Sequence, residues 1–230
     1  MQISKRLGAC AELVRKGAVL ADVGTDHAYL PIYLLKKGSI RFAHLCDVNE
    51  GPLARAKENA MAEGLLGSVE FHLTSGAGAL ASLGITDYCI CGMGGELIAD
   101  IIAAAPALFD NGVNLILQPM TRPEALRAFL FENGFEIISE HFVAEDGKFY
   151  LIINSSYTGT AVEYTAADAH FGKTESIKEK TPEALGYMRV REAALLKKIR
   201  GIEQVGGDAS AERELLLGLH SRIDLITEGN

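Results

Sequence analysis

Short apolar runs alternate with amphipathic stretches of helical period over the first 154 residues. Apolar runs of this length predict buried strands, and glycine or proline beside an amphipathic stretch marks a helix boundary. The strands are expected at 18–23, 41–48, 69–73, 87–91, 113–118, 135–143 and 148–154. The helices are expected at 3–16, 32–37, 52–63, 96–104 and 123–133. This alternation predicts an α/β fold with a mostly parallel sheet.

The last two expected strands differ from the others because no helix separates them. Residues 144–147 (Ala-Glu-Asp-Gly) form a connection of hairpin length. The sheet is therefore expected to be Rossmann-like and to end in an antiparallel hairpin. Residues 155–181 are polar, and a domain linker is expected in the first part of this segment. Two helices, 182–205 and 209–228, have apolar residues at three- and four-residue steps, which predicts an antiparallel, coiled-coil-like helical hairpin.

The composition predicts a folded cytoplasmic protein, which we expect to be a monomer. Its 230 residues suffice for two modest domains, expected over 1–156 and 157–230. No apolar run approaches the ~20 residues of a membrane helix, and no secretory signal is recognised. The four cysteines lack ligand spacing and partner histidines, so no metal site is expected. Cys89 and Cys91 share one face of a strand and are expected to be core thiols.

The charge distribution leaves two interpretations open for the C-terminal region. A formal charge of −8 argues against a nucleic-acid-binding protein whose whole surface is basic. A local basic face is nevertheless present on the first C-terminal helix and the segment before it: Lys173, Lys178, Lys180, Arg189, Arg191, Lys197, Lys198 and Arg200. These residues form either a solvated helix face or an arm that binds phosphates.

The first turn of the expected sheet is typical of a ligand site. Gly24 follows the 18–23 strand and lies between Asp22 and Asp26. A glycine there allows a ligand to approach the backbone. Two carboxylates repel a pyrophosphate and suit a cationic ligand such as S-adenosyl-L-methionine. The alternative is that Asp22 ends a strand and Asp26 caps a helix. The terminal hairpin favours S-adenosyl-L-methionine, because a dinucleotide-binding sheet is expected to stay parallel to its last strand.

Other strands of the expected sheet also end in polar or glycine-rich positions. Asp47 lies 23 residues after Gly24, close to the ~20-residue spacing typical of an acidic residue that binds ribose. The small residues of 74–78 leave room for an adenine, and also occur in plain turns. The GMGG sequence at 92–95 predicts a backbone-lined floor where substrate meets cofactor. Gln118 is a candidate to hydrogen-bond a nucleobase.

The motifs resemble those of the bacterial tRNA adenine-N1 methyltransferases that modify adenine 22 of tRNA. The resemblance rests on DVGTDHAYLP, DVNEGPLARAKENA, DYCICGMGG and LILQPMTRPEALRAFLFENGFEIISEHFVAEDGKFYLII, in this order and followed by the helical hairpin. It covers essentially the whole chain. It implies S-adenosyl-L-methionine as cofactor and tRNA as substrate.

The resemblance also implies roles for individual residues. It places around the cofactor Arg6, Asp22, Gly24, Thr25, Asp26, His27, Tyr29, Leu30, Asp47, Val48, Ser75, Gly76, Gly92 and Met93. It assigns to the catalytic centre Asp26, Gly92, Met93, Gly94, Gly95 and Gln118. Asp26 is expected nearest the transferred methyl group. The chain differs from the family's usual residues at Asp47, Ser75 and Met120.

The expected reaction is methyl transfer to N1 of an adenine. N1 carries an in-plane lone pair, so the enzyme mainly aligns the reactants and excludes water. N1 also lies on the Watson–Crick edge, which means that the base must be unpaired or turned out. Two alternatives remain open: the same cofactor with another RNA, a protein or a small molecule as substrate, and a non-catalytic module that only binds the cofactor.

Overall fold

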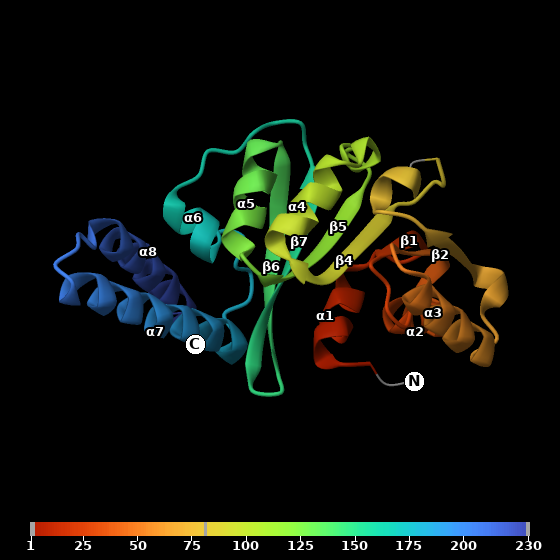
Figure 1. The fold of residues 1–230 in the computed structure, drawn as a ribbon, viewed down its shortest axis with the longest axis horizontal. Coiled ribbons are helices and arrows are strands. Elements are labelled where there is room, and N and C mark those ends of the chain that lie inside the picture. Colours follow the sequence, from red (N-terminus) through yellow and green to blue (C-terminus); the bar gives the residue numbers. More distant parts are fainter. Residues whose placement is uncertain (1–2, 81, 229–230) are drawn as a thin grey trace.

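A single seven-stranded sheet forms the centre of the computed structural model, which describes residues 3–80 and 82–228 (Figure 1). The strand order is β3-β2-β1-β4-β5-β7-β6. The strands are β1 (Ala18–Val23), β2 (Ile40–Asp47), β3 (Val69–Leu73), β4 (Asp87–Gly94), β5 (Asn114–Thr121), β6 (Phe135–Glu145) and β7 (Lys148–Tyr157). β7 pairs antiparallel with both β5 and β6, and the other pairs are parallel. The predicted Rossmann-like sheet with a terminal antiparallel hairpin is confirmed.

Helices cover both faces of the sheet and form two hydrophobic clusters. Helix α1 (Lys5–Leu13) precedes the first strand, and α2 (Tyr29–Lys36), α3 (Glu50–Ala62), α4 (Gly95–Ala103) and α5 (Pro123–Glu132) connect successive strands. Three 3-10 turns lie at Leu66–Ser68, Ala77–Leu80 and Pro106–Leu108. On β5, Leu115 and Leu117 belong to the cluster with α4 and α5, whereas Ile116 belongs to the cluster with α1, α2 and α3. This alternation follows from the two-residue period of a strand.

Tertiary contacts change several of the predicted boundaries. The first helix, expected over 3–16, ends at Leu13, because the Arg15 amide donates to Asp87 Oδ1 on β4 at 3.1 Å instead of continuing the helix. The second begins at Tyr29 rather than Ile32. The other boundaries mostly shift by one to three residues. Ser4 caps α1 as predicted, since its hydroxyl accepts from the Leu7 amide at 3.3 Å.

The GMGG segment is part of a strand and not a free turn. Met93 pairs with Pro119, and Gly94 pairs with Thr121, across bulges in the β4–β5 ladder. Pairing therefore extends β4 to Gly94 and β5 to Thr121, beyond the predicted ends at Cys91 and Gln118. The turns that follow these two parallel strands therefore begin directly beside each other, after Gly94 and Thr121.

The polar segment 155–181, in whose first part a linker is expected, contains regular structure. It begins with the end of β7 and includes α6 (Ala166–Phe171). Thr165 and Asp168 form a capping box at the start of α6, in which each side chain accepts from the other residue's backbone amide. This short helix packs against α5 and α8, so the segment is more than a connection.

The two C-terminal helices, α7 (Pro182–Gln204) and α8 (Ser210–Thr227), lie side by side as the predicted hairpin, at the end of the molecule opposite α2 and α3 (Figure 1). Their buried residues Met188 and Ile223 belong to the same cluster as α4 and α5.

The division of the chain into two domains at residue 156 stays a prediction. None of the helices in the described ranges is both long and apolar enough to span a membrane.

Candidate active site

The carboxyl ends of the central strands meet at one edge of the sheet. Val23 at the end of β1 pairs with Cys46 on β2 and with Ile90 on β4. In an open parallel sheet, ligands bind at this edge where the strand order reverses, which here is between β1 and β4. The amides of Gly24 and Thr25 both donate to the Cys46 carbonyl, at 2.8 and 3.0 Å, and hold the turn after β1.

A cavity of about 420 Å³ lies between this turn, α1 and the end of β4. Nine of the residues expected to bind the cofactor line it: Arg6, Asp22, Gly24, Thr25, Asp26, His27, Tyr29, Leu30 and Gly92. Sequence reasoning missed three lining residues, Leu7, Ala28 and Cys91. Cys89 is fully buried as expected, but Cys91 is not an ordinary core thiol, because β4 reaches the cavity at this point. The period of a strand cannot indicate where the strand meets a cavity.

Position 24 requires glycine for two reasons, its backbone conformation and the close approach of Met93. Its φ of +78° lies in the left-handed region that favours glycine. A Cβ at this position would overlap the terminal methyl group of Met93. Met93 therefore packs against the turn after β1, although it does not line the cavity. The space beside Gly24, expected to admit a ligand, is occupied by this side chain.

Asp22 and Thr25 provide the observation that tests whether a cationic ligand fits the cavity. Burial raises the pKa of Asp22 from its ordinary value of 3.8 to about 7, and no lysine or arginine pairs with it within the described ranges. The Thr25 hydroxyl is buried beside this carboxylate, where it lowers the pKa of Asp22 in part, and it has no partner at good hydrogen-bond geometry within the described ranges. A desolvated carboxylate without a cation, next to a buried hydroxyl, fits a ligand that carries an ammonium group. Arg6, in the same cavity, offers a positive charge to the ligand's carboxylate.

Asp26 lies at the mouth of the cavity rather than on its floor. Its side chain is 62% exposed and pairs with Arg55 of α3. The hydrogen bond from Arg55 lowers the pKa of Asp26, so its carboxylate is ionised at neutral pH. His27 Nε2 lies 3.2 Å from the same carboxylate. The interpretation of Asp26 as a helix cap is wrong, because Ala28, with a φ of +55°, occupies the cap of α2 and no side chain caps that helix.

Gln118 holds the far wall of the cavity in place. Its Oε1 accepts from Arg6 Nη1 at 2.5 Å and from the Gly92 amide at 3.2 Å. Its Nε2 donates to the Pro119 carbonyl at 3.1 Å. The side chain is fully buried. We call these three residues, Arg6, Gly92 and Gln118, the cavity wall; direct contact between Gln118 and a nucleobase stays a prediction.

The last two glycines of GMGG allow the end of β4 and the start of α4 to pack closely against the turn between β5 and α5. A Cβ at Gly95 would overlap the Arg122 carbonyl, and a Cβ at Gly94 would lie 3.2 Å from Thr121 Oγ1. The absence of side chains therefore lets the start of α4 contact the turn between β5 and α5. Neither glycine lines the cavity, and Gly92 is the GMGG residue that does.

The residues expected around the ribose and adenine lie farther along the same edge. Asp47 ends β2, and its carbonyl accepts from the Thr74 amide after β3 at 3.0 Å. Its carboxylate accepts from the Asn49 amide at 2.8 Å. Val48 and Ser75 are exposed, and Gly76 is buried with a φ of +110°. These four positions (Asp47, Val48, Ser75 and Gly76) lie outside the lining of the cavity, and their contacts with the cofactor stay predictions.

One group of potential metal ligands lies on the sheet away from the cavity lining. His44 on β2 and Glu70 and His72 on β3 have donor atoms within 4.8 Å of one another. His44 Nδ1 lies 3.0 Å from His72 Nε2. Sequence spacing did not indicate this group, because the pairing of His44 with Glu70 across the sheet brings distant residues together. The expectation that the chain has no metal site stays a prediction.

Comparisons with known proteins agree with this geometry. A family model described as "Methyltransferase domain" matches residues 3–153. The Bacillus subtilis tRNA (adenine(22)-N(1))-methyltransferase is 33% identical over 153 residues, which cover 66% of this chain and 64% of that enzyme, slightly less than two thirds of its length. The Streptococcus pneumoniae protein Sp1610, solved in complex with S-adenosyl-L-methionine, is 34% identical with a TM-score of 0.78, and the match covers 99% of both chains.

A third relative is also similar over the C-terminal helices. Mycoplasma capricolum TrmK, solved with S-adenosyl-homocysteine, is 26% identical with a TM-score of 0.75, and the match covers 100% of this chain and 98% of TrmK. The similarity therefore includes α7 and α8 as well as the sheet. This chain belongs to the methyltransferase family, in the group that contains the bacterial tRNA (adenine-22-N1) methyltransferases.

Proposed function

We propose that this protein transfers the methyl group of S-adenosyl-L-methionine to N1 of an adenine in tRNA, with adenine 22 as the target. The observation that carries the proposal is the cavity floor, where the desolvated Asp22 carboxylate lies beside the buried Thr25 hydroxyl and lacks a protein cation. The similarity to relatives described as tRNA (m1A22) methyltransferases supports the choice of substrate.

The residues of the cavity bind and orient the cofactor. S-adenosyl-L-methionine supplies a methyl group bound to a positively charged sulfur. The carboxylate form of Asp22 attracts the ammonium group of the cofactor, and Thr25 gains a hydrogen-bond partner. Arg6 attracts the carboxylate group. Because Gln118 holds both Arg6 and Gly92, the wall keeps a defined shape when the substrate arrives.

The reaction needs no base before the attack, because N1 of adenine has a lone pair. A bond from N1 to the methyl carbon forms as the carbon–sulfur bond breaks, and the electron pair of that bond stays on sulfur. The positive charge passes to the adenine. Asp26, ionised and exposed at the mouth of the cavity, attracts this charge. The main contributions of the protein are alignment and the exclusion of water.

Nucleoside analysis tests the proposed reaction. Unmodified bacterial tRNA is incubated with the protein and methyl-labelled S-adenosyl-L-methionine, and label is expected in 1-methyladenosine. A tRNA with guanine in place of adenine 22 is the matched control and should stay unlabelled. Label in another nucleoside would refute the reaction. Label in the control tRNA would show that the methylated adenine is not adenine 22. Cofactor binding without transfer to any RNA would favour the non-catalytic module.

A further inference from the structure

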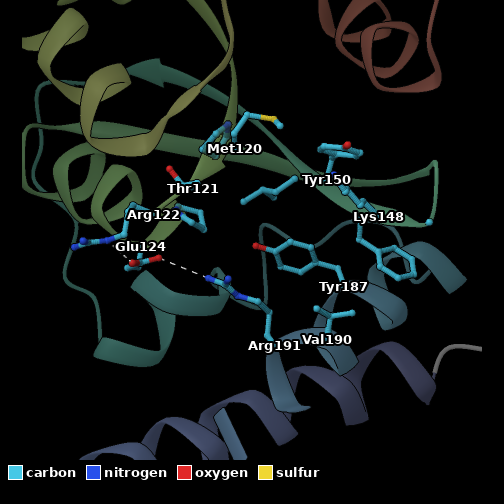
Figure 2. A pocket seen from close by; sticks show the side chains of 14 residues that line it. Met120, Thr121, Arg122, Glu124, Lys148, Tyr150, Tyr187, Val190 and Arg191 are labelled. Atoms are coloured by element: carbon cyan, nitrogen blue, oxygen red, sulfur yellow. Dashed lines mark hydrogen bonds and ion pairs between the residues drawn. The ribbon is translucent and has the colours of Figure 1, made fainter. Parts of the chain in front are cut away.

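A second cavity, of about 600 Å³, lies beside the cavity wall. The turn between β5 and α5, the β6–β7 hairpin and α7 enclose it (Figure 2). No single motif of the sequence indicates it, because its lining comes from three separate stretches of the chain, 119–124, 147–151 and 187–191. Its volume is sufficient for a nucleotide.

Two contacts connect the second cavity to the cofactor cavity. The Arg6 guanidinium carbon lies 5.5 Å from the centre of the Tyr150 ring, and Tyr150 lines the second cavity. Gln118 Nε2 lies 3.5 Å from Met120 Sδ, which belongs to the same lining. The wall residues Arg6 and Gln118 therefore contact side chains that line the second cavity, and Arg6 itself lines the first. A substrate whose reacting base lies at the wall can extend into the second cavity.

The lining is basic and aromatic, although the whole chain is acidic. Against a formal charge of −8 for the chain, three of the four charged side chains here are basic: Arg122, Lys148 and Arg191, with Glu124 as the acid. Tyr150 and Tyr187 supply aromatic surface, and Figure 2 shows the Tyr187 ring between the hairpin and the β5–α5 turn. Basic groups bind phosphates, and aromatic rings stack against unpaired bases.

Glu124 positions two of the basic groups. Its Oε1 lies 2.8 Å from Arg122 Nε, and its Oε2 lies 3.6 Å from Arg191 Nη2 (Figure 2). Arg122 has a φ of +52°, a conformation that is uncommon for a side-chain-bearing residue and often marks a functional site. The missing side chain of Gly95 leaves room for the Arg122 carbonyl in this conformation. The two arginines thus reach the cavity from different elements, the β5–α5 turn and α7.

We infer that the second cavity binds the unpaired nucleotide next to the target adenine, with its base against Tyr150 and Tyr187 and its phosphate beside Arg122 and Arg191. The inference rests on the proposed function and adds a substrate subsite to it. It also assigns a role to α7, which brings Arg191 to the substrate. Two other basic residues of α7 form ion pairs away from this cavity: Arg189 pairs with Glu192 at 2.8 Å and Lys198 with Glu212 on α8 at 2.9 Å.

Replacing Arg191 with a neutral side chain of similar size tests the subsite. Arg191→Gln is expected to raise the KM for tRNA about tenfold, the effect of losing one charge-assisted hydrogen bond. The slope of log affinity for tRNA against log salt concentration should fall in magnitude by about 0.7–0.9, as expected for one lost phosphate contact. Affinity for S-adenosyl-L-methionine, measured by calorimetry, should not change.

Arg189→Gln is the matched control, because it removes the same charge from the same helix, two residues away and outside the lining. It should change the KM for tRNA less than twofold. An Arg191→Gln enzyme with wild-type KM and wild-type salt slope would overturn the subsite and leave the proposed function intact. Failure of the wild-type protein to methylate tRNA would instead overturn the proposed function, and the subsite with it.

The base itself can be followed by fluorescence. 2-Aminopurine placed in the tRNA on one side of the target adenine, and then on the other, should be quenched by binding in one of the two positions, because stacking quenches this base. The quenching should weaken in the Tyr187→Leu protein and persist in Arg189→Gln. If neither position is quenched by the wild-type protein, the base does not stack in the second cavity.

Discussion

At the scale of single residues, Asp22 shows how burial prepares a side chain for a cationic ligand. Its pKa of about 7 lies well above the ordinary value of 3.8. Between these two values the folded protein holds a proton that the unfolded chain releases, so the stability of the ligand-free protein falls as pH rises through this window. A cationic ligand favours the carboxylate, and its affinity should therefore rise with pH and level off above about 7.

Asp22→Asn should show separately how the Asp22 carboxylate affects the stability of the ligand-free protein and how it affects cofactor affinity. The neutral amide removes the penalty of burying a charge, so the ligand-free variant at pH 8 should be more stable than the wild type by on the order of 1–4 kcal/mol. Affinity for S-adenosyl-L-methionine should fall at least tenfold and lose its pH dependence around pH 7, because the ammonium loses its counter-charge. Chemical denaturation and calorimetry over pH 5–9 measure the two effects.

Asp224→Asn is a suitable control for this experiment, since Asp224 is exposed on α8 and outside the cavity. It should change neither quantity. An Asp22→Asn protein that binds the cofactor as tightly as the wild type would contradict the assignment of Asp22.

At the scale of elements, a buried ion pair attaches α6 and α5 to the sheet. Arg127 on α5 donates from Nε to Glu140 Oε1 on β6 at 2.5 Å, and both side chains are fully buried. Arg127 Nη1 also donates to the carbonyls of Ala169 and His170 at the end of α6, at 3.1 Å each. A Cβ at Gly172 would overlap the Glu140 carboxylate, so only glycine fits at this position directly after α6.

Arg127→Met should strongly destabilise the protein. It removes one partner of a buried pair and leaves the Glu140 charge without compensation, which costs about 3–5 kcal/mol. Urea denaturation measures the loss. Arg189→Met breaks the exposed pair with Glu192 and should cost less than about 1 kcal/mol. A loss below about 1 kcal/mol for Arg127→Met would show that the buried pair does not hold these elements together.

At the scale of the whole molecule, the sheet and the C-terminal helices share one core. Phe142 of β6 lies 5.0 Å from Tyr187 of α7, measured between ring centres. The fully buried Leu219 and Ile226 of α8 belong to the same cluster as Leu126 and Leu130 of α5. Separation of the two parts would therefore expose apolar surface on both.

The shared core predicts a single unfolding transition. Scanning calorimetry of the full chain should show one peak, with equal calorimetric and van't Hoff enthalpies, because the sheet and the helical hairpin lose their common core together. Saturating S-adenosyl-L-methionine should move the whole peak to higher temperature. Two peaks, of which only one moves with the cofactor, would show that residues 1–156 and 157–230 unfold independently.

The sequence predicted those features that depend on neighbours a few residues apart. The apolar runs, the turn at Gly24 and the short connection at 144–147 identified the sheet and its antiparallel end. Many residues that line the 420 Å³ cavity could also be predicted from the sequence, because Asp22, Gly24 and Thr25 come from one continuous turn. Hydrophobic period and turn chemistry act over this short range, and a single sequence records them directly.

The tertiary structure decided which distant side chains meet. It paired Asp26 with Arg55, placed Gln118 behind Arg6 and Gly92, and brought α7 to the wall of a second cavity. It also brought the last two GMGG glycines into contact with the turn between β5 and α5, while their contact with a substrate stays a prediction. These outcomes depend on strand pairing and on packing between segments tens of residues apart, and local patterns carry no record of them. The sequence by itself therefore determined the fold and the turn at Gly24, and packing alone decided how the two cavities are built.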